Sequence, residues 1–105
     1  MTPTLRQRYE AEVSALADER ARLQTAGWEL ERIARYLHRR RRRIGLRYRL
    51  RTPIFGQQGQ IAIYRRNLRV YGDALGPSID WLRQRGRTWD EICQSASRSG
   101  GRDVG

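Results

Sequence analysis

The side chain best suited to acid–base chemistry in this sequence is a single histidine surrounded by arginine. His38 is the only histidine, and the stretch 37–53 that contains it holds eight arginines and no acidic residue. Imidazole has an unperturbed pKa near neutrality, and nearby positive charge lowers it. We therefore expect His38 to be neutral and able to act as a general base. The alternative is a histidine at the edge of the core that makes one hydrogen bond.

Arg41 differs from the other arginines of this stretch in its predicted position. If the residues around it form a helix, Arg41 lies inside an apolar stripe with Leu37 and Ile44. A charged group on a stripe that faces the core needs a partner or an opening to solvent. Arg41 is therefore expected either to pair with a carboxylate, Asp73 or Asp80, or to bind an anion in a pocket.

A second polar cluster lies between residues 64 and 73. Arg66 and Asn67 are predicted to project away from the apolar stripe of this segment, whereas Tyr71 shares a face with a tyrosine one heptad earlier. RNA-binding sites use tyrosine beside arginine to stack on bases and neutralise phosphates, although tyrosines at this spacing also occur in cores. A pocket beside Arg41 would then open toward Arg66 and Tyr71.

These residues suggest RNA cleavage without a metal ion. In this hypothesis the histidine takes the proton of the ribose 2′-hydroxyl, and arginines stabilise the charge that develops on the phosphate. The candidate catalytic residues are His38, Arg41, Arg66, Asn67 and Tyr71. Residues 32–72 contain no carboxylate, which argues against a metal-dependent nuclease there, so no metal and no other cofactor is expected.

The composition points to a polyanionic partner. The chain of 105 residues has a formal net charge of +11, all 22 basic residues are arginine, and thirteen of these lie between residues 32 and 72. Such a charge favours RNA, DNA, an anionic membrane surface or an acidic protein. Arginines expected on a solvated or phosphate-binding face are Arg39, Arg40, Arg42, Arg43, Arg47, Arg65 and Arg69. The alternatives to an enzyme are an arginine-rich nucleic-acid-binding protein of phage or plasmid origin and an adaptor for an acidic protein.

Hydrophobic periodicity predicts the long helices that position these residues. A first helix should span residues 3–26, with Thr2 at its start and Gly27 at its end. A second should run from about residue 28 to 43, and residues 44–51 fit either its continuation or a short strand.

The third predicted helix, which includes residues 61–71, has apolar residues on two sides. A helix of this kind is usually enclosed by its neighbours, so we expect it at the centre of the fold. Asp73 follows Gly72 and should hold the turn at 72–77 by accepting hydrogen bonds from nearby backbone amides.

Two short helices should complete the domain. Ser78 is placed to cap one that ends near residue 85, and Thr88 with Glu91 forms a capping box for a last helix of about ten residues. The expected fold is an all-α, compact orthogonal bundle of about five helices, forming a single domain at residues 1–98. Residues 99–105 form a glycine-rich tail that is expected to be flexible.

One internal similarity runs through the predicted helix junctions. Residues 23, 27, 30, 31 and 33 match residues 82, 86, 89, 90 and 92 at identical offsets. Two helical hairpins with a glycine cap explain the match. The alternative is a helix-turn-helix DNA reader, in which residues 27–43 supply a short helix and then a basic one.

Four motifs together resemble the C-terminal segments of bacterial polymorphic toxins, the Rhs-type effectors among them. They are IYRRNL at 63–68, YGDALGPS at 71–78, LRQRGRTWDEI at 82–92 and SASRSGG at 95–101. The similarity covers roughly residues 30–103, and YGDxLGP followed by a short helix with tryptophan is its most specific part. The resemblance carries no catalytic residue over to this chain.

The resemblance implies a small toxic domain that is delivered into a competing cell and is inhibited by a cognate immunity protein. The positive charge of the chain suggests that this partner is acidic. The site of action would be the bacterial cytoplasm. The N-terminus is polar, so delivery is expected to use a secretion apparatus and not a signal peptide. The chain begins with its own methionine and has no delivery region, which suggests an excised domain or a different use of the same module.

The single cysteine excludes a disulfide within the chain. Cys93 suits either a reducing compartment or a small side chain in the core.

Overall fold

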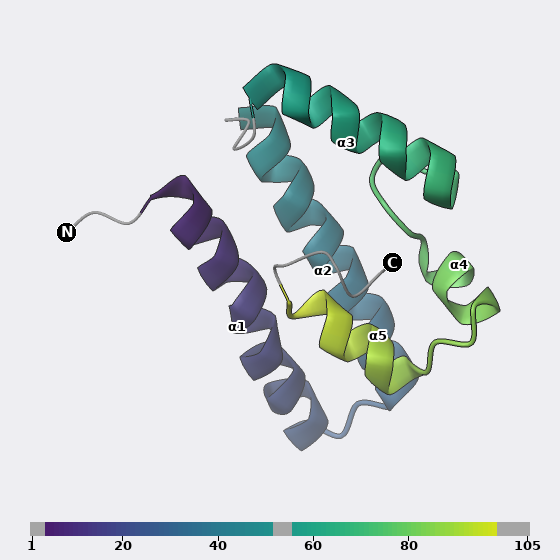
Figure 1. The fold of residues 1–105 in the computed structure, drawn as a ribbon. Helices are drawn as coiled ribbons and strands as arrows, with labels where there is room; N and C mark the ends of the chain where they lie inside the picture. Colours follow the sequence, from purple (N-terminus) through teal and green to yellow (C-terminus); the bar gives the residue numbers. More distant parts are fainter. Residues whose placement is uncertain (1–3, 52–55, 99–105) are drawn as a thin grey trace.

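The structure is a computed structural model that describes residues 4–51 and 56–98 of the chain. Five α-helices account for most of these residues (Figure 1). They are α1 (Leu5–Thr25), α2 (Leu30–Arg51), α3 (Gly56–Tyr71), α4 (Ile79–Gln84) and α5 (Trp89–Ala96). The described residues contain no strand, which confirms the all-α prediction. Residues 44–51 continue α2, so the strand alternative was wrong. The predicted tail at 99–105 lies outside the described residues.

The helix starts follow from side-chain caps that satisfy free backbone amides. Ser78 caps α4, and Thr88 with Glu91 forms the predicted capping box of α5. The start of α1 differs from the prediction, because Thr4 is its N-cap and forms a capping box with Gln7. Thr2 and its neighbours lie outside the described residues. The glutamine three residues after Thr4 is the signal that decides between the two threonines.

The internal similarity corresponds to two helix ends of the same type. Gly27 and Gly86 have φ angles of 88° and 81°, in the left-handed region that favours glycine. In each turn the amide that follows the glycine donates to the carbonyl five residues earlier, that of Leu23 or Leu82, at 3.1 Å. This is the Schellman pattern. The match therefore reflects two helical hairpins, and the helix-turn-helix alternative fails because α2 is one uninterrupted helix.

The hydrophobic core lies where α1, α2 and α5 pack together. α1 and α2 run antiparallel, and α5 lies against both, while α3 and α4 lie on the other side of α2 (Figure 1). The largest fully buried side chains come from these three helices: Val13, Ile33, Leu37, Ile92 and Cys93. Cys93 is thus a small core residue. No helix in the described ranges is long and apolar enough to cross a membrane.

The prediction that the third helix is central was wrong. Leu68 of α3 is 55% exposed, and Ile61 and Val70 are exposed as well. The buried side of α3 instead carries Asn67 and Tyr71. Asn67 bonds to the turn that follows α3 and Tyr71 packs on Trp81 of α4, while α5 packs against both α1 and α2. The apolar residues of α3 therefore remain at the surface.

The different environments of Ile33 and Leu68 lead to a stability prediction. Replacing Ile33, which is fully buried, by alanine should lower the free energy of unfolding by about 2–5 kcal/mol, because it leaves a cavity in the core. The matched change Leu68→Ala should cost less than about 0.5 kcal/mol, because that side chain is mostly in water. Urea unfolding of both variants measures the difference. A cost at Leu68 as large as that at Ile33 would contradict the exposed position of α3.

Candidate anion-binding site

The positions of the α2 arginines follow from the face of the helix that is buried. Ile33, Leu37 and Ile44 are buried against α1 and α5. With 3.6 residues per turn, this burial turns a different set of side chains toward α3 and α4. A pocket of about 460 Å³ lies on this side. Its lining residues are Arg35, His38, Arg39, Arg42, Arg43, Leu46, Leu75 and Ile79.

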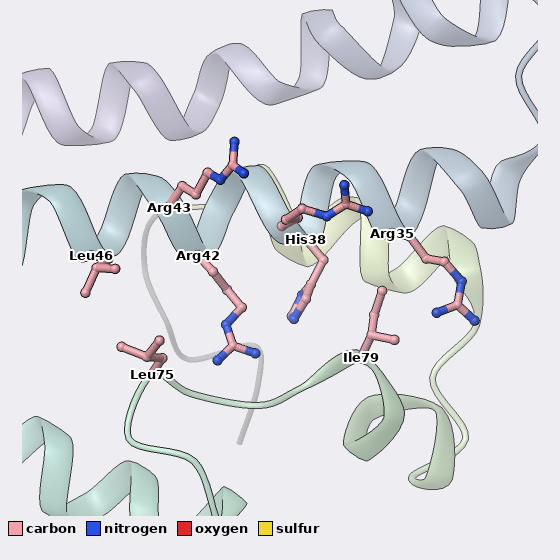
Figure 2. Close-up of a pocket in the computed structure, with 8 residues that line it drawn as sticks. Arg35, His38, Arg42, Arg43, Leu46, Leu75 and Ile79 are labelled. Carbon is pink, nitrogen blue, oxygen red and sulfur yellow. The ribbon is translucent and has the colours of Figure 1, made fainter.

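The second wall of the pocket comes from the segment that joins α3 to α4. His38 and Arg42 point from α2 toward Leu75 and Ile79 of this wall (Figure 2). The two residues that this side contributes to the lining, Leu75 and Ile79, are apolar. The pocket therefore combines positive charge on one side with an apolar surface on the other, as many ligand sites do.

Asp73 connects the two walls. One carboxylate oxygen accepts a hydrogen bond from the Leu75 amide at 2.8 Å, and the other accepts one from Arg42 at 2.9 Å. The Leu75 amide and the Arg42 guanidinium together hold the pKa of Asp73 below its usual value. The predicted role of Asp73 in holding the turn is confirmed. The side-chain amide of Asn67 adds a bond to the Ala74 carbonyl at 2.9 Å.

Two of the four arginines of the pocket have a carboxylate partner, and two have none among the described residues. Arg42 is held by Asp73, and Arg35 donates to Glu31 at 3.1 Å. Arg39 and Arg43 are exposed, and neither has an ion pair, a hydrogen bond or a ring contact within the described ranges. They are four residues apart on one helix, so their side chains project on the same side, one turn from each other.

His38 lies between these arginines as a neutral base. Burial, followed by the positive charge of Arg42, lowers its pKa to about 4, although the Pro77 backbone and Asp73 offset part of the effect. The expectation of a neutral imidazole agrees with this, but burial contributes more to the low pKa than any single arginine. Nε2 of His38 is buried and has no hydrogen-bond partner among the described residues. Buried polar atoms without a partner are uncommon in folded proteins, so this nitrogen is a candidate for a ligand contact.

Arg41 does not line this pocket, and the expectation that it pairs with Asp73 or Asp80 was wrong. Its guanidinium lies 5.2 Å from the centre of the Tyr9 ring on α1, so it is stabilised by a cation–π contact. Neither Asp73 nor Asp80 forms an ion pair with it in the described ranges, and it is absent from the pocket lining. The reason is its position on the side of α2 that faces α1, whereas Asp73 lies on the opposite side and pairs with Arg42.

The remaining candidate catalytic residues also lie outside the pocket. Asn67 is buried and bonded to the backbone, so the prediction that it projects outward was wrong. Tyr71 packs edge-to-face on Trp81, with ring centres 4.8 Å apart, and Arg66 is exposed on α3. Among the five residues proposed for catalysis, only His38 lines the pocket.

The predicted phosphate-binding arginines occupy three different environments. Arg39, Arg42 and Arg43 line the pocket. Arg47 pairs with Glu12 of α1 at 2.8 Å. Arg40 on α2 and Arg65 and Arg69 on α3 are exposed, lie outside the pocket lining and have no ion pair in the described ranges.

Sequence reasoning missed four residues of the lining. Arg35, Leu46, Leu75 and Ile79 contribute to the pocket but were not among the candidates. The helical spacing of 35, 39, 42, 43 and 46 could have indicated the α2 members, since all fall on one face. The other two depend on where the chain returns to α2, which local patterns do not show.

Comparisons of the chain with protein-family models, with curated protein sequences and with solved structures found no match. The site itself is therefore the basis for assigning a function.

The low pKa of His38 leads to a prediction about stability and pH. In the unfolded chain the imidazole takes a proton near its ordinary pKa of 6.5, whereas in the folded protein it does so only near 4. The contribution of His38 to the free energy of unfolding is therefore complete above pH 6.5. It falls as the pH drops toward 4, by up to about 3 kcal/mol. Unfolding measured at several pH values should show this loss in the native protein.

The matched control is His38→Gln, which has no titrating group at this position. Its stability should lack the decline between pH 6.5 and 4 that His38 causes, and both proteins should share the losses caused by carboxylates. An identical pH dependence of the two proteins would show that His38 is not the group responsible.

Proposed function

We propose that this protein binds nucleic acid through the arginine-lined pocket of α2. The observation that carries the proposal is the pair Arg39 and Arg43, whose charges no described residue balances, at the rim of a pocket that contains two further arginines. Guanidinium groups bind phosphate oxygens with paired, charge-assisted hydrogen bonds. A phosphate group would supply the negative charge that the pocket lacks.

The distribution of charge outside the pocket favours a polymer over a small anion. Arg40 on α2 and Arg65, Arg66 and Arg69 on α3 are exposed, and the net charge of the whole chain is +11. A nucleic acid carries one charge per phosphate and can contact several such residues at once. An acidic protein inhibitor would compete for the same arginines.

Cleavage of RNA by an antibacterial toxin domain is the second candidate function. It is favoured by His38, a neutral base with an unpaired ring nitrogen inside an arginine-lined pocket. In this mechanism His38 accepts the proton of a ribose 2′-hydroxyl, and the pocket arginines stabilise the phosphate as the hydroxyl oxygen attacks it. The resemblance to polymorphic toxins and the proposed acidic immunity partner belong to this second candidate.

Binding should depend strongly on salt and on the unbalanced arginines. Affinity for a short RNA, measured by fluorescence anisotropy, should fall as salt rises, because phosphate contacts release counterions. Arg43→Gln should weaken binding and reduce the slope of log affinity against log salt by about one. Arg8→Gln removes the same charge from an exposed residue of α1 outside the pocket and should change little. Equal effects of the two variants would refute the proposed binding site.

Catalysis requires a separate test. If the second candidate is correct, the purified protein should degrade RNA but not DNA in the presence of a chelator, and His38→Ala should abolish cleavage while leaving the circular dichroism spectrum unchanged. Expression in a bacterial cytoplasm should arrest growth and degrade total RNA. Binding without product after long incubation, or cleavage that survives His38→Ala, would exclude this mechanism.

A further inference from the structure

The pocket has more unbalanced positive charge than one internal phosphate of a nucleic acid can neutralise. Two of its four arginines, Arg35 and Arg42, are neutralised by Glu31 and Asp73, and His38 is neutral. Arg39 and Arg43 remain unbalanced, so the site is short of two negative charges. An internal phosphodiester carries one negative charge, whereas a phosphomonoester carries between about 1.5 and 2 at neutral pH.

The arrangement of the two free arginines also suits a phosphomonoester. Arg39 and Arg43 are one helical turn apart, and both line the same pocket. A terminal phosphate has three unesterified oxygens, enough for paired hydrogen bonds from both guanidinium groups. An internal phosphate has only two such oxygens, and the nucleic-acid strand continues on both sides of it.

The shape of the pocket limits what else can accompany the phosphate. Its volume of about 460 Å³ lies in the range of sites for small ligands. Leu46, Leu75 and Ile79 give it an apolar side that a sugar and a base could contact. A site of this volume could hold one nucleotide, such as the end of a strand.

We infer that this pocket binds a nucleotide through a terminal phosphomonoester, with the phosphate on Arg39 and Arg43 at its rim. The inference rests on the proposed nucleic-acid binding where the nucleotide is the end of a strand. The same chemistry is presented by a free mononucleotide, so the two sources need separate measurements.

The test compares single-stranded RNAs of one sequence that differ only at their ends. Strands with a 5′-phosphate, a 3′-phosphate or hydroxyls at both ends are titrated into the full chain, and adenosine 5′-monophosphate is titrated separately by calorimetry. At least one phosphorylated end should bind about tenfold more tightly than the hydroxyl-ended strand, which corresponds to one additional charge-assisted contact. The double variant R39Q/R43Q should lose this preference.

The matched control is R8Q/R40Q, which removes two positive charges from exposed residues outside the pocket lining. It should weaken binding of phosphorylated and hydroxyl-ended strands by the same factor and keep the preference between them. Arg39 and Arg43 are exposed, so their substitution should leave the fold intact, which circular dichroism can verify.

The outcomes separate this inference from the proposed function. Equal binding of phosphorylated and hydroxyl-ended strands, or a preference that survives R39Q/R43Q, would overturn the inference and leave nucleic-acid binding in place. Binding of the mononucleotide but of no strand, with loss in R39Q/R43Q, would support the site and refute the polymer as its ligand. Failure of every strand and of the mononucleotide to bind would refute both.

Discussion

Burial of the apolar stripe of α2 is the constraint on which the rest of the structure depends. Ile33, Leu37 and Ile44 pack against α1 and α5, and this fixes the rotation of the helix about its own axis. Once that stripe is buried, the directions in which the intervening arginines project are fixed, because side-chain positions on a helix are set by its period. The positive side of α2 is thus a consequence of core packing, and it places several like charges within a few turns.

The ion pairs of α2 offset only part of the repulsion between its arginines. Carboxylates from outside the arginine run, Asp73 and Glu12, reach Arg42 and Arg47, and the aromatic ring of Tyr9 stabilises Arg41. Partly exposed pairs of this kind contribute little to stability individually, so their main effect here is positional. Asp73 has the larger consequence, because it joins α2 to the segment before α4 and so connects the two walls of the pocket.

Much of the local structure follows from local signals, and the candidate site follows only in part. The caps at Ser78 and Thr88 satisfy backbone amides a few residues away, so the sequence pattern was sufficient to predict them. His38 was recognisable as a neutral base beside arginine, yet its low pKa comes first from burial, which depends on the fold. The role given to Arg41 belonged instead to Arg42, since one position along a helix changes direction by about 100°.

The sequence by itself determined an all-α chain, its helix junctions at Gly27 and Gly86, and a basic middle without carboxylates, because each depends on neighbours within one or two turns. Only the tertiary structure decided which helix is central. Two-sided apolar patterning favoured α3, but α5 fills that place against α1 and α2. It also decided which arginines lack a partner, because carboxylates distant in the sequence, such as Asp73, reach α2 only through the folded path of the chain.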